Sequence, residues 1–210
     1  APVCSPTRAS VLTGRHPMRS NMPNHGHYMR PQETTLPEAL KSAGYVTGHF
    51  GKWHIGSVQP DSPTSPGQIG FDEWLTGLNF FDQNPYLAKN GKYVQLKGQG
   101  SVHTMDATLD FLRKHKDGDK PMFAVTWFPA PHDPHKEVPV KFPGSDELYK
   151  KLKKKYGIAD RFRGYFLEIT LLDQQVGRLR KELRKMDIAD NTLVWYCSDN
   201  GGLVKESSGG

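Results

Sequence analysis

The stretch "TLPEALKSAGYVTGHFG" (residues 35–51) predicts a helix that is followed directly by a strand. Thr35 suits the N-terminal cap of this helix, Pro37 suits its first turn, and Gly44 suits the residue that ends it. The next residues, Tyr45–Gly51, have the composition of a short strand. A helix and a strand in immediate succession are typical of α/β layered proteins.

The same alternation continues on both sides of this stretch. Near the N-terminus, Ser5 suits an N-terminal cap, Pro6 suits the first helical position and Gly14 suits the end of a helix. Apolar residues at three- and four-residue steps predict further helices at Met105–His115 and Arg161–Met186.

Two near-continuous apolar runs, Pro121–Pro129 and Asn191–Gly202, predict strands that are buried on both faces. The predicted fold class is therefore α/β, with a layered, mixed and mostly parallel sheet flanked by helices. Residues Ser57–Val102 are rich in Gly, Pro, Asn and Gln, and they predict a long excursion with little regular structure, of the kind that usually carries function or lines a site.

The net charge of +6 is concentrated in Lys150–Gly157 and Arg178–Met186. Solvated helix faces explain such runs, and no nucleic-acid-binding motif accompanies them, so we expect no nucleic-acid partner. We also expect no membrane span, because the sequence has no run of about 18 apolar residues. The two cysteines, Cys4 and Cys197, do not make a disulfide framework.

Polar groups follow three of the predicted strands: "GKWHIG" (51–56), "APHDPH" (130–135) and "SDNGG" (198–202). Ligands of open α/β sheets bind at the carboxyl ends of the strands. We therefore expect these groups to converge with the cysteine that lies at the start of the first helix. The predicted site consists of Cys4, Arg8, Lys52, His54, His132, Asp199 and Asn200.

These residue types suit a tetrahedral oxyanion held between cations and a metal. A helix N-terminus favours an anion, and Arg8 lies one turn after Cys4. Asp199 and Asn200 offer hard oxygen ligands for Ca²⁺ or Mg²⁺. Each feature alone also has a structural explanation, since a lone cysteine is usually a small apolar residue and Asp-Asn-Gly is usually a turn.

The motifs, in this order, resemble those of the type I sulfatases in the alkaline-phosphatase-like superfamily. "PVCSPTRASVLTG" (2–14) is similar to the first family signature, Cys-x-Pro-Ser/Thr/Ala-Arg, and "GYVTGHFGKWHIG" (44–56) is similar to the second. Phe50 departs from the smaller residue that is usual at its position. "GFDEW" (70–74), "APHDP" and "SDNG" follow in family order.

The resemblance implies that Cys4 is oxidised to formylglycine by a formylglycine-generating or anaerobic sulfatase-maturating enzyme. The hydrated aldehyde, held on Ca²⁺ or Mg²⁺, would attack the sulfur, and its second hydroxyl would allow sulfate to be expelled. Carried over by position, the resemblance implies that Arg8 holds the hydrate, and that Lys52 and His132 bind sulfate. His132 would also donate a proton, and His54 would be the base for elimination. The metal ligands would be Asp199, Asn200 and the group made from Cys4.

In the family, an acidic pair on an earlier strand completes the metal site, and a lysine and a smaller domain follow the Asp-Asn motif. The resemblance therefore implies that residues 1–210 are part of a catalytic domain, and that this part alone binds metal poorly and has little activity. Lys205 lies too close to Asn200 to be that lysine. A periplasmic, secreted or lysosomal location is implied by resemblance alone.

The expected activity is hydrolysis of sulfate esters, with a sulfated carbohydrate favoured over a small aryl ester. Trp74, Phe80, Phe81 and Tyr86 are candidates for stacking on a sugar, although aromatic residues more often serve packing. Two alternatives stay open. One is a phosphodiesterase or phosphonate monoester hydrolase of the same superfamily. The other is an unmodified homologue that binds sulfated glycans without cleaving them.

Overall fold

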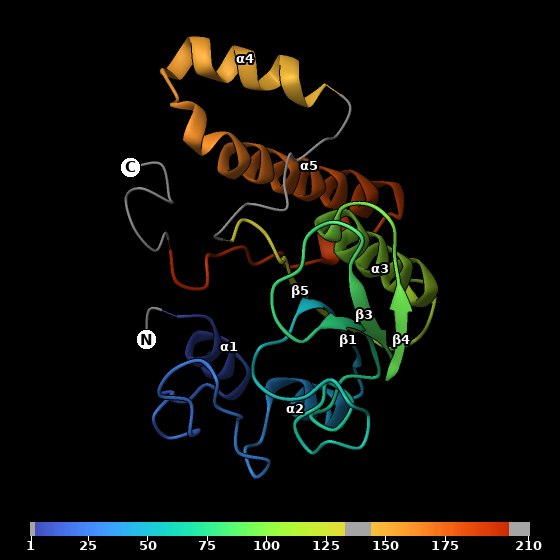
Figure 1. The fold of residues 1–210 in the computed structure, drawn as a ribbon. Helices are drawn as coiled ribbons and strands as arrows, with labels where there is room; N and C mark the ends of the chain where they lie inside the picture. Colours follow the sequence, from blue (N-terminus) through green and yellow to red (C-terminus); the bar gives the residue numbers. More distant parts are fainter. Residues whose placement is uncertain (1–2, 133–143, 202–210) are drawn as a thin grey trace.

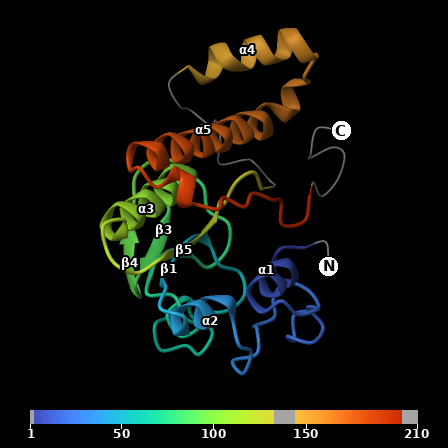
Figure 2. The ribbon, with the colours of Figure 1, turned by 180° about the vertical axis from the view of Figure 1, so that it is seen from behind.

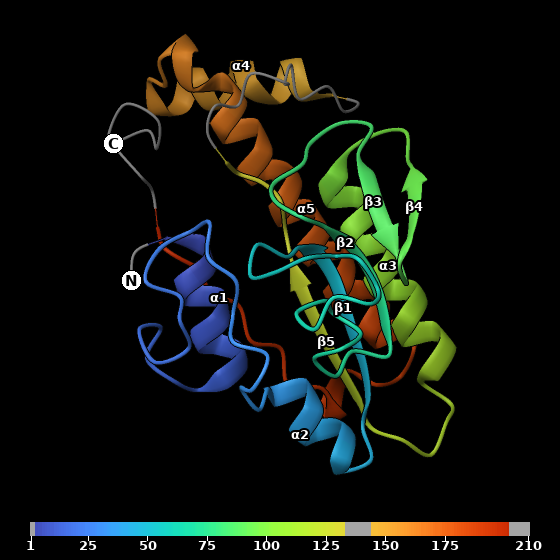
Figure 3. The same cartoon turned by 60° about the horizontal axis from the view of Figure 1, so that its bottom comes forward.

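The computed structural model describes residues 3–132 and 144–201, which form a mixed sheet between two layers of helices (Figures 1 and 3). The strand order is β4-β3-β2-β1-β5; β1 pairs in parallel with β2 and β5, and β3 and β4 add an antiparallel hairpin. The strands are β1 (Val46–Lys52), β2 (Glu73–Gly77), β3 (Tyr86–Lys89), β4 (Lys92–Gln95) and β5 (Met122–Trp127). The predicted α/β class is confirmed. The expectation of little regular structure in Ser57–Val102 is wrong, because β2, β3 and β4 lie in this range and pairing in the sheet that contains β1 orders them.

Helices lie on both faces of the sheet. α3 packs directly on β1 and β5, with α5 behind it and α4 outermost, while α1 and α2 lie on the opposite side (Figures 2 and 3). The helices are α1 (Cys4–Thr13), α2 (Leu36–Ser42), α3 (Gly100–His115), α4 (Ser145–Tyr156) and α5 (Arg163–Lys185), with short 3-10 turns at Asp160–Phe162 and Ala189–Asn191. No helix in the described ranges is long and apolar enough to cross a membrane.

Local sequence fixes the ends of the first two helices. Thr35 and Glu38 form the reciprocal capping box of α2, with the Thr35 N–H donating to the Glu38 carboxylate at 2.8 Å. Gly14 ends α1 in the left-handed conformation, as predicted. The prediction that Ser5 caps α1 is wrong. The helix begins at Cys4, two residues before the predicted first helical residue Pro6, with the extended Val3 at the cap position.

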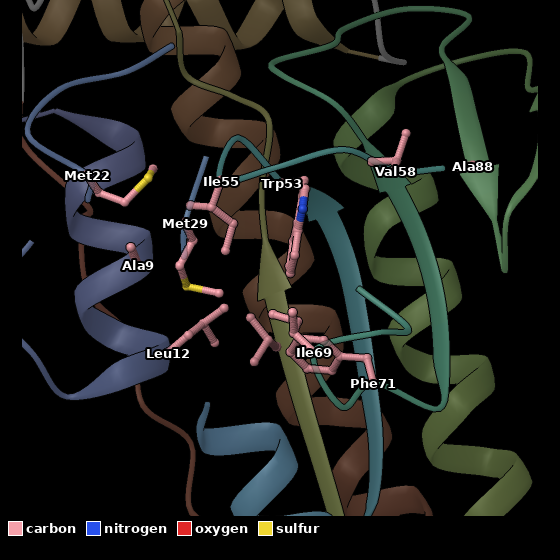
Figure 4. Close-up of a cluster of buried hydrophobic side chains, with 11 residues drawn as sticks. Ala9, Leu12, Met22, Met29, Trp53, Ile55, Val58, Ile69, Phe71 and Ala88 are labelled. Atoms are coloured by element: carbon pink, nitrogen blue, oxygen red, sulfur yellow. The ribbon is translucent and has the colours of Figure 1, made fainter. Parts of the chain in front are cut away.

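One hydrophobic cluster joins α1 to the carboxyl end of the sheet (Figure 4). Ala9 and Leu12 of α1 lie in it together with Trp53 and Ile55, which follow β1. The Trp53 indole N–H donates to the Thr64 carbonyl at 3.0 Å, so its polar atom is satisfied inside the core. This cluster therefore holds the N-terminal half of the chain rigidly against the end of β1.

A second cluster lies between the opposite face of the sheet and α3, and it includes Leu183 near the end of α5. α3 begins at Gly100, five residues before the predicted start at Met105. The extra turn opens with Gly100 and Ser101, which are weak helix formers, so propensity alone does not reveal it. Packing stabilises this turn, because both residues are buried.

The prediction of a strand at Asn191–Gly202 is wrong. The residues from Thr192 to Cys197 form no strand within the described part of the chain, and Leu193 and Trp195 are 88% and 82% exposed. β5 is the outermost strand of the described sheet on this side, and no described strand pairs with its outer edge. The prediction that β5 is buried on both faces is also wrong, because only Val125 in it is buried.

Candidate active site

Cys4 lies in the first turn of α1, directly above the end of β1. The ammonium of Lys52, the last residue of β1, donates to the Cys4 sulfur at 3.2 Å. Burial raises the pKa of the Cys4 thiol. The interactions with His132 and His54, together with the charge and hydrogen bond of Lys52, outweigh this effect of burial, so the pKa falls from 9.0 to about 5. The unmodified sulfur is therefore a thiolate at neutral pH.

Arg8 lies one turn along α1 and is buried. One guanidinium nitrogen donates to the Lys52 carbonyl at 3.0 Å, and another donates to the Asp199 carboxylate at 2.9 Å. Burial lowers the pKa of Arg8, while the charges of Asp199 and Cys4 oppose that shift. Arg8 thus connects the end of β1 to the segment that carries Asp199.

An aromatic platform lies under Arg8. Its guanidinium carbon is 4.7 Å from the centre of the Trp127 ring, at the end of β5. The His49 ring meets the edges of Trp127 and Trp53 at 5.1 and 4.7 Å between centroids. Burial, aided by the charge of Arg8, holds the pKa of His49 well below its usual value, so its ring is neutral and bonds Thr76 at 2.8 Å.

Sequence reasoning did not identify Trp127 and His49 as residues near the site. Trp127 ends a strand next to β1, so the position of a strand end was the available signal for it. His49 carried no comparable signal, since a histidine in mid-strand is explained equally well by packing.

The two site histidines approach Cys4 from different loops. His54 follows β1 in a left-handed conformation with φ 61°, and its backbone N–H donates to the Leu78 carbonyl at 2.9 Å. His132 follows β5, and its ring stacks on Phe80 with 4.3 Å between centroids and 10° between planes. Both imidazoles lower the pKa of the Cys4 thiol, and the Nδ1 atom of His54 is buried with no hydrogen-bond partner among the described residues. Proton-transfer groups therefore flank the position of the Cys4 sulfur.

Asp199 and Asn200 form the oxygen-bearing side of the site. Asp199 is paired with Arg8, and the side-chain oxygen of Asn200 is buried with no hydrogen-bond donor among the described residues. An orphaned carbonyl oxygen beside a carboxylate is a suitable donor set for a hard cation. The described residues contain no cluster of three or more His, Cys, Asp or Glu side chains that could hold a metal, so they fit only part of a Ca²⁺ coordination shell.

Comparison with known proteins identifies the family of the chain. A model of the sulfatase family matches residues 1–210. The chain belongs to the sulfatase family. An ulvan-active sulfatase from Formosa agariphila is 31% identical over 215 residues, which cover 97% of this chain and 42% of the relative. The human N-acetylgalactosamine-6-sulfatase is 30% identical over 237 residues, with 97% and 42% covered.

Solved structures agree with this assignment. Ps i-CgsB in complex with k-i-k-neocarrahexaose matches with a TM-score of 0.81 and 25% identity over 96% of this chain and 49% of that structure. The phosphonate monoester hydrolase SpPMH from Silicibacter pomeroyi matches with a TM-score of 0.51 and 18% identity over 90% and 51%, which shows a shared fold alone. This sulfatase-family chain spans less than half the length of these curated relatives.

Within this sulfatase-family chain, the predicted residues come together as follows. Lys52, His54 and His132 contact Cys4, and Arg8 joins Lys52 to Asp199, next to which Asn200 lies. Two further residues considered from the sequence, His135 and Lys205, lie outside the described residues.

Proposed function

We propose that the protein containing this chain hydrolyses sulfate esters of a carbohydrate, with formylglycine made from Cys4 as its nucleophile. The observation that carries the proposal is the convergence of Lys52, His54 and His132 on the Cys4 sulfur at a helix N-terminus, with Arg8 one turn away. Two cations, Lys52 and Arg8, and two imidazoles around one position suit a sulfate group, which carries a negative charge on its outer oxygens. The relatives' names, which refer to ulvan and N-acetylgalactosamine-6-sulfate, support a sulfated carbohydrate.

In this proposal each side chain acts at a stated atom. Formylglycine, made by a dedicated maturation enzyme, supplies a hydrated aldehyde whose one hydroxyl is the nucleophile and whose other hydroxyl provides the exit route for sulfate. Lys52 and His132 bind the outer sulfate oxygens, and His132 donates a proton to the departing alcohol oxygen. His54 removes the proton of the second hydroxyl, a general-base step for which an imidazole is the most common side chain.

Asp199 and Asn200 are the proposed ligands of a divalent cation, Ca²⁺ or Mg²⁺, which would neutralise sulfate charge and lower the pKa of the attacking hydroxyl. Arg8 would hold the hydrate and balance its charge; its guanidinium also donates to Asp199 at 2.9 Å, which keeps that carboxylate at the edge of the site. The remaining oxygen ligands would come from outside the described residues. A periplasmic, secreted or lysosomal location stays a prediction from resemblance.

The test uses the full-length protein produced with and without a maturation enzyme. Mass spectrometry of the peptide that contains Cys4 would detect the aldehyde, and turnover would be measured on matched sulfate and phosphonate esters. We expect the modified protein to hydrolyse the sulfate ester and the unmodified protein to be nearly inactive. A preference for the phosphonate ester would favour the phosphonate hydrolase alternative, and binding of sulfated glycan without any modification would favour the non-catalytic alternative.

A further inference from the structure

The β3–β4 hairpin carries two exposed tyrosines that stack on each other. Tyr86 and Tyr93 are 62% and 43% exposed, and their rings are parallel, with 5.3 Å between centroids and 1° between planes. The Gln59 side-chain amide donates to the Tyr93 hydroxyl at 3.0 Å, which fixes the orientation of that ring. The hairpin therefore presents a flat and ordered aromatic surface to solvent.

The strand register places this surface near the active site. Lys52 is paired with Gly77 of β2, and the pairing of Thr76 with Ala88 puts Leu87 opposite Gly77 when the register is continued. Tyr86 comes next, at the edge where β1 and β5 end, because β3 runs in the opposite direction (Figure 3). Two strand spacings of about 4.8 Å separate the backbone of Tyr86 from that of Lys52 by roughly 10 Å.

Two exposed apolar side chains lie on the segment between the active site and the hairpin. Phe80 stacks on His132, and Leu78 accepts from the backbone of His54 through its carbonyl oxygen. Both side chains are exposed, and both lie on the segment between β2 and Tyr86. We name this surface the aromatic strip; it consists of Leu78, Phe80, Tyr86 and Tyr93.

Exposed lysines lie on the hairpin and directly after it. Lys97 follows β4 at the end of the hairpin where Tyr86 lies, whereas Lys89 and Lys92 are paired at the turn and, by strand alternation from Ala88 and Tyr93, lie on the opposite face of the sheet. None of the three forms an ion pair with a carboxylate of the described residues. A polymer of sulfated sugars has apolar ring faces that pack on aromatic rings and sulfates that are attracted to lysines.

We propose that the aromatic strip binds further sugar units of a sulfated polysaccharide whose sulfate ester occupies the active site. The inference rests on the proposed function and extends it, because it makes the substrate a chain of sugars and not a single sulfated sugar. The strip lies on the His132 side, so the bound units are joined to the alcohol that leaves.

The experiment compares three full-length proteins: the natural sequence, the double variant Tyr86→Ala/Tyr93→Ala and the control Tyr156→Ala. Tyr156 is also 62% exposed but lies on α4, away from the hairpin. Substrates are size-fractionated oligosaccharides of ulvan and of carrageenan, together with sulfated monosaccharides. We expect the KM of the double variant for the longer oligosaccharides to rise about tenfold, which is about 1.4 kcal/mol. Its kinetics on the monosaccharides and the kinetics of the control should be unchanged.

A binding measurement separates this inference from the proposed function. In a Cys4→Ala background, calorimetry with the same oligosaccharides needs no turnover, so a weaker affinity in the double variant supports the strip even where hydrolysis fails. Equal losses for monosaccharide and oligosaccharide, or equal losses in the control, would overturn it. A lower Tm of the double variant without any dependence on oligosaccharide length would assign the rings to an interface with the rest of the polypeptide, and would also overturn it.

Discussion

The two sides of the active site are built differently. Cys4, Arg8 and Lys52 lie on regular elements that the buried cluster around Trp53 fixes to one another. Asp199 and Asn200 lie on an extended segment whose side chains from Leu193 to Tyr196 are exposed. In the described structure the cationic side is preorganised by its own core, while the Arg8–Asp199 ion pair connects the oxygen-bearing side to it.

The largest expected difference between the two sides is in their contribution to the free energy of unfolding, and one tryptophan from each side tests it. Trp53→Ala removes a fully buried indole and should lower the free energy of unfolding of the 210-residue polypeptide by about 3–5 kcal/mol. Trp195→Ala removes a ring that is 82% exposed and should change it by less than about 0.5 kcal/mol. Urea unfolding measures both. A large loss at Trp195 would show that its segment is packed as firmly as the core.

Breaking the connection should be nearly as costly for activity. Arg8→Ala in the full-length protein removes both donors, to the Lys52 carbonyl and to Asp199, and kcat/KM for a sulfate ester should fall by about 10²–10³. Arg8→Lys should recover little, because one ammonium does not reproduce the planar fork that reaches two partners. Full activity of Arg8→Lys would mean that charge alone, without the connection, is sufficient.

The third contrast concerns pH and uses the unmodified chain with Cys197→Ser, so that Cys4 is the one remaining thiol. Alkylation by iodoacetamide should follow a titration with its midpoint near pH 5, since the pKa of Cys4 is lowered from 9.0 to about 5. Lys52→Met should move the midpoint upward, because it removes a charge and a hydrogen bond that stabilise the thiolate. A midpoint near 9 in the natural chain would show that the cationic side is not preformed.

The same shift predicts a dependence of stability on pH. Because the folded-state pKa lies below the ordinary value, the thiolate contribution is complete above about pH 9 and is lost as the pH falls through about 5. The difference in Tm between the natural chain and Cys4→Ser should therefore grow in favour of the natural chain as the pH rises across this window.

The comparison also explains which features were predictable from sequence. The capping box at Thr35 and the stop at Gly14 depend on neighbouring residues, so local chemistry predicted them. The convergence of Lys52, His54 and His132 followed from the rule that strand ends share one edge of a sheet. The strand predicted to include Thr192 to Cys197 is absent from the described residues because a strand needs a partner strand, and pairing is not a property of the segment itself. The position of Trp127 at a strand end could be read from the sequence, but its contact with Arg8 depends on how α1 packs against β5, which no local pattern encodes.

The smallest expected effect concerns that platform. Trp127→Leu keeps an apolar side chain at the end of β5 but removes the ring that faces the guanidinium, so kcat in the full-length protein should fall about tenfold while KM changes little. Trp127→Phe retains an aromatic face and should recover most of the loss. If leucine and phenylalanine behaved alike, the ring would only fill space, and the hydrogen bonds of Arg8 would be sufficient to orient it. Recovery by phenylalanine alone would show that the orientation of Arg8 depends on an aromatic ring of the sheet as well as on its hydrogen bonds. The position of Asp199, in contrast, depends on Arg8.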